Sequence, residues 1–109
     1  MAILKHLSFS KALSVMHLLE GCEKLHFQLK RHIHIGAYQN GREQGITVWD
    51  YDRELTYFVA EHRNSDQMVT YRGEHSMQGI PEDAYGHRNF FGNIEDCVDW
   101  IVGDLLEGE

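Results

Sequence analysis

The chain of 109 residues is 42% hydrophobic and 25% charged, and its formal net charge is −7. Its length predicts one domain, residues 1–109, which can bury about two-thirds of its unfolded surface without metal or disulfide cross-links. No run of residues approaches the ~18 consecutive apolar residues of a membrane span, and acidic proteins repel phosphate backbones, so the composition excludes a membrane protein and disfavours direct binding of nucleic acid.

The first segment has the pattern of an amphipathic helix. Ser8 or Ser10 can cap its start, and Gly21 is placed to end it. The apolar residues that follow helical spacing, and that we expect on the buried side, are Phe9, Leu13, Met16 and Leu19.

The same segment resembles an export signal only superficially. Lys11 and His17 interrupt its apolar region, and Glu20 stands where a lipoprotein cleavage site needs a small or apolar residue. The chain holds two cysteines, Cys22 and Cys97, far apart and in no C-x-x-C arrangement. We therefore expect a cytoplasmic protein with reduced, non-catalytic thiols.

From Leu25 the apolar pattern changes to a period of two, which predicts a strand. The strand prediction is firmest from Lys30 onward, and an extension of the first helix through Leu25 and Leu29 is the alternative. The residues expected on the apolar side of the strand are Leu25, Phe27, Leu29, Ile33, Ile35 and Ala37.

Two hairpins are predicted to follow. Asn40-Gly41 offers a type I′ turn, with Ile35 opposite Ile46 and a longer loop ending at Gly45 as the alternative. A turn at Asp52-Arg53 would then pair residue 48 with residue 57. Both registers place the same residues on the buried side of the sheet, namely Ile33, Ile35, Ile46, Val48 and Val59.

Residues 67–73 predict a fourth strand whose facing the pattern leaves open, and Pro81 can begin one helical turn. Asn93 caps the final helix, and Glu95 and Asp96 suit its first turn. The apolar stripe of that helix is Ile94, Cys97, Val98, Ile101, Val102 and Leu105. The predicted fold is α+β, a four-stranded antiparallel meander with an N-terminal and a C-terminal amphipathic helix.

His32 and His34 are the nearest approach to a chemical motif. Residues two apart on a strand project to the same side, so both can reach one metal ion or small ligand. The predicted register places Thr47 and Trp49 opposite them, and neither is a usual metal ligand. We therefore expect no cofactor and no enzyme activity, and keep a metal- or ligand-binding domain as the alternative.

The side of the sheet that carries these histidines is also aromatic. It holds Trp49, Tyr51 and Phe58, with Tyr71 a further candidate. Exposed apolar patches of that size are uncommon on monomers, so we expect the two helices to sandwich the sheet or a second subunit to cover this face, forming a homodimer.

Charge supplies the leading functional hypothesis. Residues 1–45 hold six Lys/Arg against three Asp/Glu, a balance of +3, whereas residues 46–109 hold four against fourteen, a balance of −10. We expect a non-enzymatic inhibitor or immunity-type protein that occludes a basic partner such as a nuclease or toxin. The predicted contacts, with their side chains in solvent on the last helix, are Asp96, Asp99, Trp100 and Asp104, with Glu82 and Asp83 secondary.

Overall fold

The structure is a computed structural model that describes residues 7–27, 29, 32–39, 44–61, 67–74 and 88–107. The helices are α1 (Phe9–Glu20), α2 (Glu23–Phe27) and α3 (Ile94–Leu106). The strands are β1 (Ile33–Gln39), β2 (Gln44–Asp50), β3 (Leu55–Glu61), β4 (Met68–Glu74) and β5 (Arg88–Phe91).

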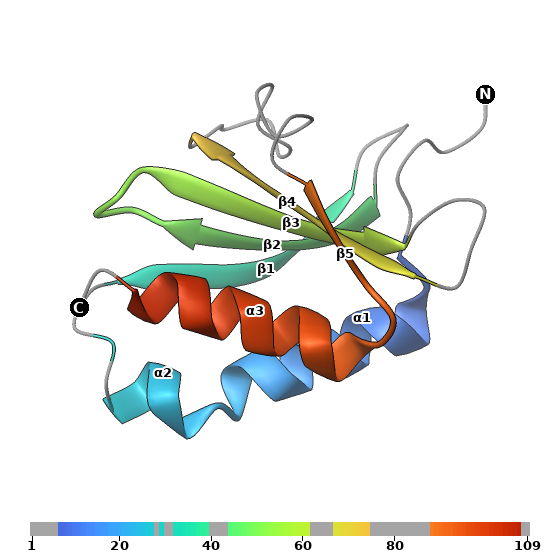
Figure 1. Ribbon diagram of the computed structural model, residues 1–109, viewed down its shortest axis with the longest axis horizontal. Coiled ribbons are helices and arrows are strands. Elements are labelled where there is room, and N and C mark those ends of the chain that lie inside the picture. Colours follow the sequence, from blue (N-terminus) through green and yellow to red (C-terminus); the bar gives the residue numbers. More distant parts are fainter. Residues whose placement is uncertain are drawn as a thin grey trace.

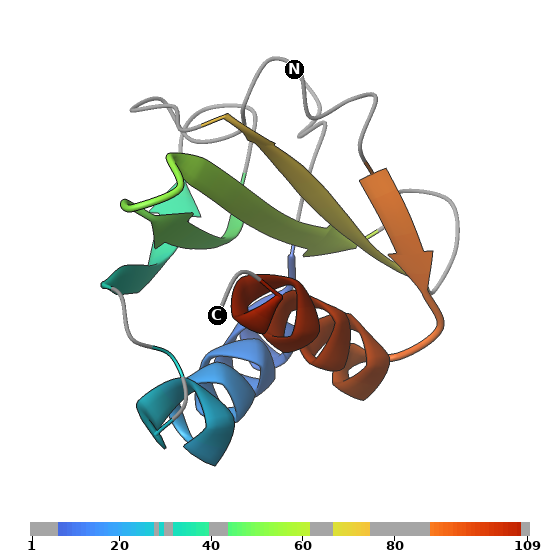
Figure 2. The same ribbon diagram turned by 60° about the vertical axis from the view of Figure 1, so that its left-hand side comes forward.

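The strands of the described ranges form one antiparallel sheet in the order β1-β2-β3-β4-β5. All three helices lie on the same side of it (Figures 1 and 2). The α+β class, the meander and the flanking helices agree with the prediction, but β5 makes five strands where four were expected. No helix in the described part of the chain is long and apolar enough to cross a membrane.

Helix α1 begins and ends where the sequence predicts, but it is rotated. The carbonyl of Ser8 accepts a hydrogen bond from Ala12 N at 2.8 Å, and Gly21 N donates to the carbonyl of His17. Val15 and Leu19 are buried, whereas Phe9 is 76% exposed and Leu13 is 45% exposed. The predicted stripe is therefore wrong at Phe9 and Leu13, because α1 carries apolar residues on more than one side.

The strand predicted from Leu25 begins later, at Ile33. Leu25 lies in α2 instead, where its N–H and that of His26 bond the carbonyl of Cys22 at 3.2 and 3.3 Å. The alternative of a helix at Leu25 is therefore right, although α2 is a separate helix rather than an extension of α1. Leu25 is buried, whereas Phe27, predicted on the same apolar side, is 78% exposed.

The first hairpin is displaced by two residues from the predicted register. Ile35 pairs with Val48 rather than Ile46, and Gln39 pairs with Gln44. The two-residue loop at positions 40–41 is therefore wrong, and residues 40–43 lie outside the described residues. Because side chains alternate with a period of two, a shift of two leaves every residue on its predicted face.

The second hairpin has the predicted register, with Val48 opposite Tyr57 and Ile46 opposite Val59. Glu54, in the connection, adopts φ 55°, the left-handed region that suits tight turns.

For the first hairpin, the predicted alternative loop ending at Gly45 is also wrong, because Gly45 lies within β2 and opposes Tyr38. A Cβ there would collide with the carbonyl oxygen of Val59 and lie 2.8 Å from the Phe58 ring, so this close approach requires glycine.

The main core lies between the sheet and the helices. It contains the predicted inward residues, with Ile46, Val48 and Val59 fully buried and Ile33 and Ile35 packed against them. A smaller cluster on the opposite side of the sheet holds Phe58, Ala60, Val69 and Tyr71. The expectation of two helices sandwiching the sheet is therefore wrong, since every described helix covers the first side.

Helix α3 follows its prediction most closely. Asn93 Oδ1 accepts a hydrogen bond from Asp96 N at 2.8 Å, which satisfies a backbone donor at the start of the helix. All but one member of the predicted stripe is buried, and Ile94 packs partly buried against the core.

Candidate functional site

A groove of about 850 Å³ runs between α3 and the segment formed by the end of α1 and the start of α2. We call its apolar side chains Leu18, Val98, Val102 and Leu106 the floor, whichever helix they come from, and its charged side chains the rim. The residues that line it are Leu18, Gly21, Cys22, Glu23, Lys24, Glu95, Val98, Asp99, Val102, Gly103 and Leu106.

One wall of the groove is a second stripe of α3. Its members recur at intervals of three and one residues, the spacing of a single helix face. At ~1.5 Å per residue the stripe extends for about 16 Å, or three turns. The stripe consists of Glu95, Val98, Asp99, Val102, Gly103 and Leu106, of which Val98 and Val102 also contact the core.

The opposite wall comes from α1 and α2. Leu18 is 39% exposed here, which leaves much of its side chain available to a partner. Gly21, which follows the last turn of α1, and Cys22 complete this wall before α2 begins.

The rim of the groove is acidic. Three carboxylates, Glu23, Glu95 and Asp99, stand against one ammonium group, that of Lys24, a balance of −2. Residues 94–107 contain no Lys or Arg to offset the acids of α3. Carboxylates around a concave apolar surface attract cations from a distance, and this attraction weakens as salt rises.

The structure separates the residues predicted to bind a partner. Asp99 lines the groove, whereas Asp96 is exposed outside it and accepts a hydrogen bond from Asn93 Nδ2 at 3.3 Å. Residues 82 and 83, the secondary contacts, lie outside the described residues.

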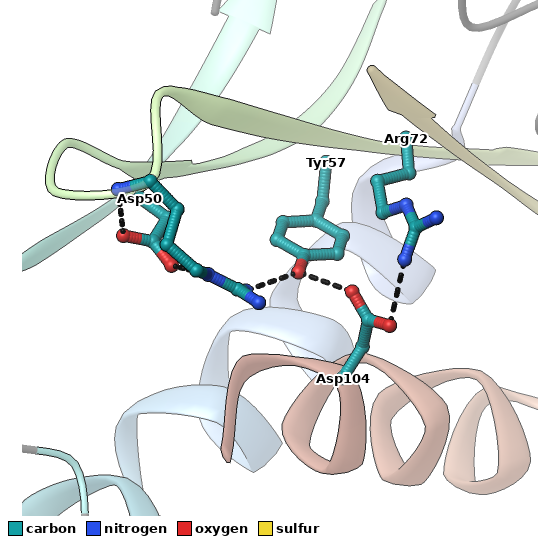
Figure 3. Close-up of polar contacts among 5 residues, drawn as sticks. Asp50, Tyr57, Arg72 and Asp104 are labelled. Atoms are coloured by element: carbon teal, nitrogen blue, oxygen red, sulfur yellow. Dashed lines mark hydrogen bonds and ion pairs between the residues drawn. The ribbon is translucent and has the colours of Figure 1, made fainter. Parts of the chain in front are cut away.

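Asp104 corrects the expectation that these acids lie in solvent, because it is only 8% exposed. Its Oδ2 accepts a hydrogen bond from the Tyr57 hydroxyl at 2.5 Å, and its Oδ1 forms an ion pair with Arg72 Nη1 at 2.8 Å (Figure 3). A carboxylate with two such partners can be buried, since its charge is compensated. Asp104 therefore joins α3 to β3 and β4.

The same network continues to the end of β2. Arg53 Nη2 donates to the Tyr57 hydroxyl at 2.9 Å, and Arg53 Nε pairs with Asp50 at 2.7 Å (Figure 3). Burial, and then the hydrogen bond to Asp104, raise the pKa of Tyr57 well above its usual range. Tyr57 stays neutral at physiological pH, and the two arginines balance the two aspartates, so the network has the chemistry of a structural cross-link.

Trp100 is also part of the fold. Its ring meets that of Tyr57 edge-on at 6.2 Å and that of Phe91 at 6.0 Å, and it packs against the main core. Trp100 lies off the aliphatic stripe of α3, but the sheet also covers this neighbouring side of the helix.

His34 lies on the side of the sheet away from the helices, and His32 precedes β1. His34 pairs with Trp49 rather than with Thr47, and the two rings stack at 5.0 Å with 13° between their planes. Within the described ranges, no three His, Cys, Asp or Glu side chains gather as a metal site. The alternative of a metal or ligand at His32 and His34 stays a prediction.

The two cysteines are free thiols with different surroundings. Burial raises the pKa of Cys97 to about 11, although the nearby Thr70 hydroxyl, 3.0 Å from Sγ, acts in the opposite direction. A thiol with so high a pKa is a poor nucleophile. Cys22 is partly exposed in the groove.

Comparison of the chain with protein-family models, curated proteins and solved structures found no match in any of the three. The site therefore has to be interpreted from its own residues. Of the residues that line the groove, the sequence prediction named Asp99 alone as a contact and missed the rim acids Glu23 and Glu95. The repeating interval from Glu95 to Leu106 was a signal for a second stripe on α3.

Proposed function

We propose that this chain is a small acidic, non-enzymatic binding protein that docks a basic partner protein and occludes its surface. A nuclease or toxin is the class of partner that this charge suits. The observation that carries the proposal is the groove, where Glu23, Glu95 and Asp99 surround an apolar floor. Such a surface combines long-range attraction with contact area that excludes water.

The mechanism is steric and electrostatic. Carboxylates on the rim steer a basic surface toward the groove, and the apolar floor then holds it. If the partner is a nuclease, the same carboxylates stand where substrate phosphates would otherwise bind. Occlusion needs no chemical step by this chain.

The contacts differ from those that the sequence predicted. Asp104 and Trp100 are committed to internal contacts, so their substitution would disturb the fold rather than the docking surface alone. Asp99 stays a proposed contact and is joined on the groove rim by Glu23 and Glu95, whereas Asp96 lies outside the groove.

The experiment is capture of the partner from the native host, followed by association kinetics on an immobilised surface over a range of ionic strength. We expect a basic partner whose on-rate falls steeply as salt rises. The double variant Glu95→Gln, Asp99→Asn should lower the on-rate further, because it removes two rim charges and leaves the core untouched.

A matched control is Asp96→Asn, which neutralises an exposed acid on the same helix outside the groove. An acidic partner, or an on-rate that neither salt nor the double variant changes, would overturn the proposal. For a captured nuclease, loss of its activity on addition of this protein is the direct test of occlusion.

A further inference from the structure

The walls of the groove restrict what can occupy it. They are built from α1, α2 and α3, whose backbone groups bond within the helices, so these walls present side chains rather than a row of free N–H and C=O groups. An extended peptide laid there would leave its own backbone groups without partners. A helix satisfies its backbone internally and needs only side-chain contacts.

We infer that the groove holds one amphipathic, basic α-helix of the partner protein, about three turns long. This inference rests on the proposed function and specifies its contact. The length follows from the groove-facing stripe of α3, about 16 Å at ~1.5 Å per residue. Recognition of this kind places apolar anchors of the bound helix at i, i+3, i+4 and i+7.

The groove supplies complementary chemistry for both sides of such a helix. Its floor, where the anchors pack, is formed by Leu18, Val98, Val102 and Leu106. Its rim carboxylates suit Lys or Arg on the flanks of the bound helix. An acidic or purely apolar helix would leave the rim charges uncompensated.

Gly103 supplies an independent observation. It lies in the interior of α3, where glycine destabilises a helix relative to alanine. A Cβ built on it meets no atom within 4 Å, so packing within the described residues does not require a glycine. The open space above Gly103 lets a second helix approach α3 closely.

The probe for this inference is a synthetic peptide of about 14 residues, with leucines at i, i+3, i+4 and i+7 and lysines at most other positions. Fluorescence anisotropy measures its affinity, and circular dichroism measures its helix content on binding. A peptide of identical composition but scrambled order is the matched control, because it has the same charge without the apolar stripe. We expect helix formation and binding for the first peptide and at least tenfold weaker binding for the second.

Variants of the protein locate the binding. Gly103→Phe places a ring in the open space of the groove, where the peptide would bind, and should weaken peptide binding at least tenfold. Gly103→Ala is its matched control for loss of the glycine and should bind at least tenfold more tightly than Gly103→Phe. Leu18→Gln removes an anchor contact from the other wall and provides a second test should Gly103→Phe fail to fold, which a thermal melt reports.

Asp99→Asn and Asp96→Asn complete the set, since only Asp99 lines the groove. The first should weaken binding several-fold and the second clearly less, because Asp96 contributes only long-range attraction from outside the groove. Equal binding of the ordered and scrambled peptides, or full binding to the Gly103→Phe and Leu18→Gln proteins, would overturn the inference.

The inference and the proposed function can fail separately. If Gly103→Phe still captures the cellular partner with the same salt dependence, the helix-in-groove inference is wrong and the acidic docking function stands. If the cellular partner is acidic or salt has no effect on its association, the proposed function is wrong and the inference fails with it.

Discussion

Helices α1 and α3 pack against the same side of one sheet, yet only α3 has the buried stripe that its sequence predicts. On α3, acids occupy most of the positions outside the aliphatic stripe, so only one orientation buries apolar residues. On α1, Phe9 and Leu13 are as apolar as Val15 and Leu19, and two orientations compete. The buried side of a helix is therefore identified by the polar residues on its opposite side as well as by its own apolar residues.

The acids of α3 also differ among themselves, because the sheet buries one of them and leaves others exposed. Asp99 and Asp104 are five residues apart, and the first lines the groove while the second is buried beside Tyr57 and Arg72. Five residues turn an α-helix by about 140°, so the two acids lie on different sides of α3. Periodicity does not say which of these sides the sheet covers, because that depends on partners 32 and 47 residues away in the chain.

The largest expected effect contrasts two leucines that the sequence assigns alike to a buried stripe. Leu105 of α3 is fully buried, so Leu105→Ala should lower the free energy of unfolding by about 2–5 kcal/mol through lost burial and a cavity. Leu13→Ala on α1 should change it by less than about 1 kcal/mol, because nearly half of this residue is already in water. Urea unfolding of both variants measures the difference, and similar losses for the two would contradict the orientation of α1.

A smaller difference should separate the two aspartates. Asp104→Asn keeps the shape of the side chain but removes the charge that Arg72 and Tyr57 compensate, and should lower the free energy of unfolding by about 1.5–3 kcal/mol. Asp99→Asn should change stability by no more than about 0.5 kcal/mol. Thermal or urea unfolding measures both. Equal stabilities would mean that Asp104 contributes no more than a surface acid.

The smallest expected effect concerns the anchor of α1 to the sheet. Burial acts to raise the pKa of Glu61, but hydrogen bonds from Ser8 N at 2.7 Å and Lys11 Nζ at 3.2 Å outweigh it and lower that pKa. A lowered pKa in the folded state means that Glu61 stabilises the fold above its unfolded pKa of about 4.3. This contribution is lost as pH falls through the folded value.

Glu61→Gln should therefore cost about 1 kcal/mol at neutral pH and progressively less in acid. Urea unfolding of the variant and the parent protein at neutral pH and at about pH 3 tests this, with Glu20→Gln, an exposed acid of α1, as the matched control. A stability difference for Glu61→Gln that stays constant with pH would show that the carboxylate charge is not what holds α1 in place.

The sequence alone determined the features that depend on neighbours along the chain. The Asn93 cap and the stripe of α3 are local, and the second hairpin follows from matching alternation on either side of one turn. The face of every paired residue of β1 and β2 was also predictable, because a register error of two leaves the alternation intact. For the candidate site, these local patterns indicated Asp99 and the acidic character of α3.

Tertiary structure decided everything that depends on distant partners. It selected the orientation of α1, placed all the described helices on one side of the sheet, packed Trp100 partly buried against the core, and buried Asp104. It also brought Leu18 and Glu23 alongside Asp99, more than 70 positions later in the chain, to form the groove. The physical reason is that periodicity reports which side of an element is apolar, whereas burial and charge compensation depend on which other element packs there.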